Sequence, residues 1–471
     1  MKHFLKRLVG FSLGPILGAI ISLIQVPILN RLLGVNEVGK AYLFQSLIVI
    51  IPTYIYFGLD QAYTREYHLY KNKRQLMQLA TLIPMIAGVI LFIIAIGFDQ
   101  NISMWLFEDP QYYYIVWYSG VWVLATVLER FLLLTIRMEE KAIEYSMFNF
   151  LLKLGTFVVS IGLALLGWRD FKVIVYGLIF GQLFGDLILF IRYRDFLNLT
   201  DFEMDLPLLK KMLAFGIPLM IATSLSSSLT AIDNIFIKQY TTSKELGIYN
   251  SAIKIINVIG IVKTAFTSFW VPTAYRWYEE RKSLKHFKFI SDIVLLGLTI
   301  IFYGILIFKP VMVFLAGGEE YSDVQYIIGL LSFPHIMYTL SETTTLGIVF
   351  SRRTYLNILV SLAAFIPSIL INMTLTPTLG YRGAALASFA SYIMFYLART
   401  YLSKRTGFYF GQRKQLISIA LMGFVAILNA FPIEHIGWIN VVFIFLTLAV
   451  QTSTIKDAIS IRNNPSEWDF D

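Results

Sequence analysis

The sequence predicts an all-α polytopic membrane protein with about 14 transmembrane helices. The chain has 471 residues, of which 57% are hydrophobic and only 15% are charged, whereas a soluble chain is about 25% charged. Its apolar stretches match the length of about 20 residues that spans a bilayer. The Lys and Arg residues fall in alternate gaps between these stretches, which is typical of cytoplasmic loops.

The predicted spans follow one another along the whole chain with short polar gaps. They cover residues 9–30, 41–60, 78–98, 113–134, 147–166, 173–191, 212–237, 247–269, 289–308, 323–345, 355–376, 383–401, 415–431 and 436–452. The N-terminus carries Lys2, Lys6 and Arg7 before an apolar run that is too long for a signal peptide and has no small-residue cleavage site. We therefore interpret this run as a retained first span.

The positive charges orient the spans. With both termini in the cytoplasm, 27 of the 39 Lys and Arg residues lie inside, 8 lie outside and 4 lie within spans. A wrong number of spans would scramble this alternation, so the charges support the number and the orientation together. Loops facing an anionic leaflet also explain the net charge of +9, and we do not expect nucleic acid as a partner.

A repeat divides the chain into two halves. Residues 33–39 (LGVNEVG) precede the second span, and residues 240–248 (YTTSKELGI) precede the eighth, at an offset of about 208 residues. About six spans follow in each half. Parallel repeats of this kind build transporters with a cavity between the halves. We predict two pseudo-symmetric six-helix lobes at 1–205 and 206–405, two further helices at 406–455 and a polar cytoplasmic tail at 456–471.

Ionisable residues within the spans are the candidate functional residues, because each costs about 2.5–3.5 kcal/mol at a helix centre unless it has a partner or a wet cavity. The cations are Arg130, Lys153, Lys254 and Lys263, and the acids are Glu129, Asp186, Asp233 and Glu342. Together the cations could form a cavity for a diphosphate or an acidic sugar. The alternative is that some of them lie near span ends and extend to the membrane interface.

Helix geometry separates some of these neighbours. Glu129 and Arg130 are adjacent and point about 100° apart, so we do not expect them to face each other. Lys254 and Lys263 are nine residues apart, or about 13.5 Å of helix rise, and lie on roughly opposite faces unless the helix is kinked. We expect Asp186 at the cytoplasmic interface, because it lies near that end of its span.

A run of hydroxyl side chains in the seventh span ends at Asp233 and Asn234. It comprises Thr223, Ser224, Ser226, Ser227, Ser228 and Thr230. Such a face meets protein or water rather than lipid. Hydrogen bonding between helices is one interpretation, and a cavity lining for a polar substrate or a coupling ion is the other. Under the second interpretation Ser227, Asp233 and Asn234 join Glu129 and Glu342 as polar site residues.

Other patterns indicate packing or exclude chemistry. Gly177, Gly181 and Gly185 share one face of the sixth span, as Gly14 and Gly18 do in the first, and predict close helix packing. Residues 34–40 match the first part of a phosphate-binding loop, but Ala41 replaces the required Ser or Thr. The chain has no cysteine and no His pair at ligand spacing, so we propose no metal site and no cofactor.

Two stretches carry a family resemblance. Asp233 and Asn234 are followed by IFIKQYTTSKELGIYNSAIKI at residues 235–255, and NMTLTP at residues 372–377 is followed shortly by GYRGAALA at residues 380–387. With these motifs, nearly the whole chain resembles the polysaccharide exporters, or Wzx-type O-antigen and capsule flippases, of the MOP (MATE-like) flippase superfamily. The resemblance implies two six-helix lobes around a V-shaped cavity, with two extra helices.

The resemblance also implies a function. The expected substrate is an undecaprenyl-diphosphate-linked oligosaccharide, which is flipped by alternating access from the cytoplasmic to the outer leaflet of the bacterial inner membrane. Membrane lipids, a polysaccharide polymerase, a chain-length regulator and a coupling H⁺ or Na⁺ are the implied partners. An enzyme is not expected, because the longest loops have about 20 residues and hold no paired acids. A MATE-like drug or cation antiporter and a lipid II flippase are the alternatives, although the first span lacks their characteristic charged residues.

Overall fold

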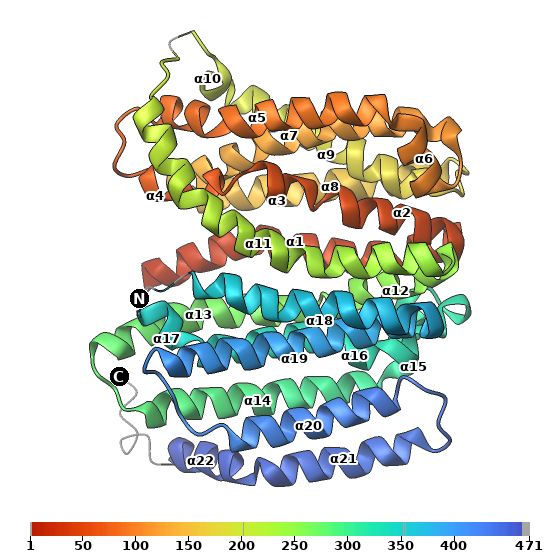
Figure 1. The fold of residues 1–471 in the computed structure, drawn as a ribbon, viewed down its shortest axis with the longest axis vertical. Coiled ribbons are helices and arrows are strands. Elements are labelled where there is room, and N and C mark those ends of the chain that lie inside the picture. The colour runs from red at the N-terminus through yellow and green to blue at the C-terminus, as the bar shows by residue number, and fades with distance from the viewer. Residues whose placement is uncertain (1, 201, 352, 354, 464–471) are drawn as a thin grey trace. The chain divides into compact units, whose positions relative to one another are not determined.

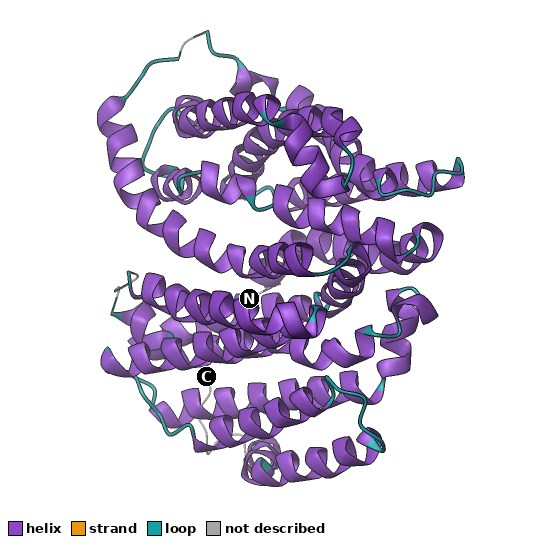
Figure 2. Cartoon of the chain, turned by 45° about the vertical axis from the view of Figure 1, so that its right-hand side comes forward, coloured by secondary structure: helices purple, strands orange, loops and turns teal. Residues whose placement is uncertain are grey.

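The computed structural model describes residues 2–200, 202–351, 353 and 355–463, and these residues are almost entirely helical. Helices make up 85% of the structure, and the described ranges contain no β-strand (Figure 2). The predicted all-α membrane class is confirmed. Ten described helices are long and apolar enough to cross a membrane, or eleven if a bent pair counts as one span. This test does not confirm the number fourteen.

Two compact units make up the chain. Unit 1 holds Met1–Asn234 and Thr242–Gly247, and unit 2 holds Ile235–Thr241 and Ile248–Asp471. The elements up to the first boundary are α1 (Lys2–Leu33), α2 (Val35–Ile48), α3 (Ile51–Ile55), α4 (Leu59–Glu66), α5 (Lys73–Gly97), α6 (Asp99–Phe107), η1 (Pro110–Tyr112), α7 (Tyr113–Met138), α8 (Ala142–Leu165), α9 (Lys172–Arg192), α10 (Arg194–Leu197) and α11 (Leu206–Tyr240). The predicted lobe boundaries at 205 and 405 stay predictions.

The second half of the chain continues the series. Its elements are α12 (Ser243–Ile256), α13 (Ile259–Glu279), α14 (Leu284–Ile307), α15 (Lys309–Ala316), η2 (Glu319–Tyr321), α16 (Val324–Thr344), α17 (Leu346–Phe350), α18 (Leu356–Leu379), α19 (Tyr381–Arg405), α20 (Arg413–Leu428), α21 (Ile436–Val450) and α22 (Thr452–Asn463). The first part of the predicted tail is helical in α22, and residues 464–471 lie outside the described residues.

The same helix pairs recur inside the two units (Figure 1). In unit 1, α5 packs on α7, α7 on α9, and α8 on α9. In unit 2, the corresponding contacts join α14 to α16, α16 to α19, and α18 to α19. Long helices that lie nearly parallel form each of these pairs in Figure 1. The internal repeat predicted from the sequence is therefore visible in how each unit is packed.

Glycines allow α8 and α9 to pack closely. A Cβ atom at Gly181 would lie 2.5 Å from the Gly155 carbonyl oxygen, and one at Gly185 would lie 2.8 Å from the Leu152 side chain. On the other side of α8, a Cβ atom at Gly18 of α1 would lie 2.9 Å from Cγ of Lys153. The predicted role of these small residues in packing is confirmed.

The second predicted span is broken rather than continuous. It runs as α2, α3 and α4, and Gly58 before α4 has a left-handed φ of 67°. A Cβ atom at Gly58 would overlap the carbonyl group of Gly216, so this close approach requires glycine. The span expected over residues 41–60 is therefore not one continuous helix, and the membrane-length stretch of this region is Val35–Ile55. The break matters for function because it gives α4, which carries Asp60, a position of its own.

The eighth predicted span is also broken. It divides at Asn257 and Val258 into α12 and α13. Lys254 therefore lies in the last turn of α12, and Lys263 lies near the start of α13. The break is the exception to a straight helix that the sequence left open.

The two repeat motifs contact each other within unit 1. The helices α2 and α12 begin at Val35 and Ser243, which are 208 residues apart. Gly39 faces the Ser243 carbonyl oxygen, and Gly247 faces the Val35 carbonyl oxygen, in both cases with no room for a Cβ atom. The contact is reciprocal: the glycine of each motif lies against the first residue of the other helix, where a larger side chain would not fit.

We predict that Gly155→Ala destabilises the protein, since the new Cβ would overlap the backbone of Gly181. Overpacking of this kind costs about 1–3 kcal/mol. The matched control is Gly162→Ala on the same helix, where nothing lies within 4 Å and alanine favours the helix by about 1 kcal/mol. Thermal unfolding of the purified protein in detergent measures both. Equal midpoints would contradict the packing argument.

Candidate functional site

In unit 1, Arg130 of α7 forms a salt bridge with Asp60 of α4. Its Nη2 atom donates to Oδ2 of Asp60 at 2.7 Å, and its Nε atom lies 3.3 Å from the same oxygen. The Asp60 side chain is 10% exposed, whereas that of Arg130 is 42% exposed. The carboxylate is thus committed to the pair, and part of the guanidinium stays accessible to another anion.

Glu129, the neighbour of Arg130, points toward α9. The Gln182 amide of α9 donates to Oε2 of Glu129 at 2.6 Å. Lys153 of α8 is close enough to attract the Glu129 carboxylate electrostatically. Glu129 and Arg130 thus face different partners, as their helical spacing predicts. The structure brings these two residues and Lys153 into one cluster of unit 1.

Asp186 belongs to the same cluster, although the sequence placed it at the membrane interface. The residue is fully buried, with 0% exposure. It lies one turn beyond Gln182 on α9, and its carboxyl group is within hydrogen-bonding reach of Glu129. The residue is therefore enclosed by protein rather than exposed, and its position at the membrane interface stays a prediction.

In unit 2, Glu342 of α16 forms a salt bridge with Arg399 of α19. Nη1 of Arg399 donates to Oε1 of Glu342 at 2.7 Å and to the Ser341 hydroxyl at 2.8 Å. Both side chains are nearly buried, at 12% and 8% exposed. Arg399 was counted with the cytoplasmic charges because it lies two residues from the end of its predicted span. The helix α19 continues to Arg405, so this arginine lies well inside it.

Lys263 joins this second cluster through an aromatic ring. Its Nζ atom lies 3.9 Å from the centroid of Tyr338, and Cζ of Arg399 lies 5.2 Å from the same centroid. His335 is one turn away on α16 and shares a 3.1 Å hydrogen bond with Asn257. Two cations beside one aromatic ring are a favourable site for an anion, because the ring stabilises both positive charges.

The other predicted site residues divide between buried and accessible positions. Asp233 and Asn234 are fully buried on α11, Lys254 is half-buried on α12, and Ser227 is exposed. Within the hydroxyl run, Ser228 shares a hydrogen bond with Tyr54. Part of this face therefore packs against α3, and Ser227 is on the accessible part. The side chain of Thr230 lies outside the described part of the chain.

The clusters occupy corresponding helices of the repeat. Glu129 meets Gln182 and Asp186 where α7 packs on α9, and Glu342 meets Arg399 where α16 packs on α19. In the order of spans predicted from the sequence, these are the fourth and sixth of each half. That all four predicted cations share one cavity stays a prediction.

A third charged cluster, which also lies in unit 2, was not singled out from the sequence. Lys414 of α20 donates to Oδ2 of Asp292 in α14 at 2.7 Å, and the Gln415 amide donates to Oδ1 at 2.7 Å. Lys414 also donates to the Thr454 hydroxyl of α22 at 3.0 Å. This pair ties the last helices to α14, which is a structural role. Asp292 lies at the start of a predicted span and Lys414 in a loop, so hydropathy alone could not join them.

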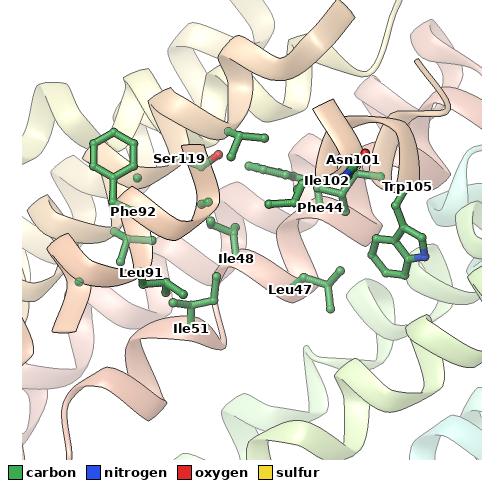
Figure 3. A pocket seen from close by; sticks show the side chains of 16 residues that line it. Phe44, Leu47, Ile48, Ile51, Leu91, Phe92, Asn101, Ile102, Trp105 and Ser119 are labelled. Carbon is green, nitrogen blue, oxygen red and sulfur yellow. The ribbon is translucent and has the colours of Figure 1, made fainter. Parts of the chain in front are cut away.

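An apolar cavity of about 480 Å³ lies in unit 1 among α2, α3, α5, α6 and α7. Figure 3 shows Leu91, Ile48 and Ile51 along its wall, with Trp105 at one end. Asn101, Ser119 and the Trp105 indole are the polar side-chain groups of its lining, and the Ser119 hydroxyl already donates to the Ile115 carbonyl at 2.6 Å. The cavity suits hydrocarbon and offers little to a charged group.

We predict that Glu342→Gln and Arg399→Gln each destabilise the protein by about 3–5 kcal/mol, because each leaves the partner's charge buried without its counterion. The double variant should cost less than the sum, which a thermal double-mutant cycle in detergent would detect. Glu280→Gln is the control, since it breaks an exposed pair with Arg276 worth at most about 1 kcal/mol. Additive losses would contradict direct pairing.

The fold is similar to solved transporter structures. The inward closed structure of the lipid II flippase MurJ aligns with a TM-score of 0.68 and 13% identity, over 95% of this chain and 99% of that chain. An inward-facing multidrug resistance MATE transporter of the MOP superfamily aligns with a TM-score of 0.60 and 16% identity, over 89% and 99%. A MOP superfamily transporter from Pyrococcus furiosus aligns at 0.57 and 15%, over 86% and 97%.

At these identities the structural similarity shows the fold, and the MOP-type architecture is confirmed. A search of curated protein sequences gives no significant match. The family profile described as "Polysaccharide biosynthesis protein" matches residues 5–277, which is more than half of the chain. The matched region includes the unit 1 cluster and Lys263 of the unit 2 cluster. The chain therefore belongs to the polysaccharide biosynthesis protein family and has the fold of MOP superfamily transporters.

Proposed function

We propose that this protein is a flippase for an undecaprenyl-diphosphate-linked oligosaccharide in the synthesis of a bacterial surface polysaccharide, such as an O-antigen, a capsule or an exopolysaccharide. It would move this substrate from the inner to the outer leaflet of the plasma membrane by alternating access. The family match over residues 5–277 is the observation that carries the proposal. The shared fold with a lipid II flippase and with multidrug transporters supports transport rather than catalysis.

The physical task explains why cations are needed within the membrane. A diphosphate and several sugars cannot enter hydrocarbon without groups that replace their water. In our proposal, the diphosphate or acidic sugars are bound by cations that lie within the predicted spans. These are Arg130, Lys153, Lys254 and Lys263, together with Arg399. The half-exposed guanidinium of Arg130 and the Lys263 ammonium on the Tyr338 ring support this role.

Polar groups of unit 1 complete the proposed substrate contacts. Ser227 is exposed on α11, and Asp233 and Asn234 are buried nearby in sequence. We propose that this face contacts sugars, while the acids Glu129 and Glu342 belong to the ion-coupling machinery. The prenyl tail would stay in the lipid. A polysaccharide polymerase and a chain-length regulator are the proposed protein partners.

The orientation is part of the same proposal. We propose that both termini lie in the cytoplasm, because most of the 39 Lys and Arg residues then lie on that side. Under this orientation the lipid-linked unit is collected on the side where its sugars are assembled.

Two other transported substrates are the alternatives. A MATE-like antiporter for drugs or cations would need acids that are free to bind a positive charge, whereas Asp60 and Glu342 are paired with arginines. A lipid II flippase is favoured by the structural similarity to MurJ. Rescue of a strain that lacks its own lipid II flippase would identify that second alternative.

A deletion strain tests the proposed function. We expect loss of one surface polysaccharide, with its lipid-linked repeat unit accumulating on the cytoplasmic leaflet. The measurement is the composition of the surface glycan and of the lipid-linked intermediates, with leaflet assignment by access of a membrane-impermeant glycan-modifying enzyme. Normal surface glycans combined with new sensitivity to cationic drugs would replace the proposal by the antiporter.

We also predict that the triple variant Lys153→Gln, Lys254→Gln and Lys263→Gln lowers glycan export by about tenfold or more, because each charge-assisted contact contributes about 1.5–3 kcal/mol. Arg130 is kept so that Asp60 retains its partner. The control is Lys71→Gln, an exposed lysine outside the membrane helices. Export is measured in the deletion strain at matched protein levels. Wild-type export from the triple variant would refute the cationic site.

A further inference from the structure

The corresponding helix pairs of the two units carry different charges. In unit 2, the contact between α16 and α19 joins the acid Glu342 to the base Arg399 at 2.7 Å. In unit 1, the contact between α7 and α9 joins two acids, Glu129 and Asp186. The first pair is neutral as it stands. The second carries two negative charges if both acids are ionised, at a place where Asp186 is fully buried.

The Asp186 carboxyl group of this acid pair lacks hydrogen-bond donors. Among the described residues, no donor reaches either oxygen of Asp186. Its polar neighbour is the Glu129 carboxyl group, which can share a hydrogen bond with it only if one of the two acids holds a proton. Gln182 donates to Glu129 at 2.6 Å, so the amide is already used on the other partner.

The helices packed around this acid pair supply it with few cations and donors. Arg130 of α7 is held by Asp60 of α4 at 2.7 Å. Lys153 of α8 attracts Glu129, and the Tyr56 hydroxyl at the end of α3 is bonded to the Thr126 carbonyl at 3.4 Å. The two acids thus face Lys153 and an arginine that is already bonded to Asp60. Like charges in contact at a buried site do not both ionise, and a membrane helix makes an unpaired charge more costly still.

We propose that Glu129 and Asp186 form a proton-binding site in which the two carboxyl groups share one proton, and that release of this proton is coupled to the transport cycle. Binding forms an O–H bond on one carboxyl, which donates to the other, and leaves the pair with a single negative charge facing Lys153. Release transfers the proton to water that enters the site and leaves two carboxylates. The coupling rests on the proposed flippase function, whereas the shared proton does not.

A proton fits this site better than a metal cation. Hard cations prefer shells of six or more oxygens, and no group of three or more His, Asp or Glu residues in the described part of the chain could hold a metal ion. Asp60, which could supply further oxygens, is occupied by Arg130. The pair offers two carboxyl groups and one amide, which is enough for a proton and too few for a complete coordination shell.

The first experiment detects the proton itself. Infrared spectra of the purified full-length protein at neutral pH should show the carbonyl band of a protonated carboxylic acid, and difference spectra compare the wild type with each variant. We expect this band to disappear in Asp186→Asn, because this variant leaves Glu129 as a single acid beside Lys153 and the Gln182 amide. Asp292→Asn is the matched control, since that buried carboxylate is held by Lys414 and Gln415. An unchanged band in Asp186→Asn overturns the site.

The second experiment tests the coupling separately. In vesicles or cells, we expect export by the wild type to respond to an imposed pH gradient, and Asp186→Asn to lower export about tenfold, a usual scale for coupling between linked sites, and to remove that response. If Asp186→Asn loses the infrared band but keeps full, gradient-dependent export, the coupling is overturned and the flippase function stands. A response to a Na⁺ gradient at constant pH that Asp186→Asn abolishes would assign the site to Na⁺ instead. Absence of glycan export by the wild type refutes the flippase, not the proton site.

Discussion

The cost of a charge inside a membrane helix is the constraint that organises this protein. Each such group needs a counterion, a hydrogen-bond partner or water, and the structure supplies partners from helices distant in sequence. Asp60 reaches Arg130 only because the second span is broken and frees α4 as a separate segment. Glu342 meets Arg399 across α16 and α19. The irregular helices are thus part of how the charges are accommodated.

The repeat gives the two units the same helix packing but different pairs of charged residues. The same helix pairs pack in both units, and a reciprocal contact between Gly39 and Gly247 marks the equivalence of the two motifs. On this shared plan, unit 2 holds a neutral acid–base pair and unit 1 holds two acids. Two acids in contact can gain or lose a proton, and this difference is the basis of the proton site proposed for unit 1.

Much of the fold could be predicted because its signals are local. Hydropathy determines the class, and the repeat offset of 208 residues was recovered at the starts of α2 and α12. The glycines of α9 pack as their spacing indicates. The break before Gly58 could not be predicted, because it depends on the close approach of Gly216, which is distant in sequence. The break at Asn257 was only left open as a possible kink.

The sequence by itself determined which residues carry charge in the membrane, and therefore where chemistry must lie. It identified Glu129, Arg130, Lys263 and Glu342, each of which the structure places in a charged cluster. Only the tertiary structure decided their partners, because a salt bridge depends on distances between helices and not on position along one. For that reason Arg399 and Asp186 were placed at helix ends from the sequence, and the fold makes them the partners of Glu342 and Glu129.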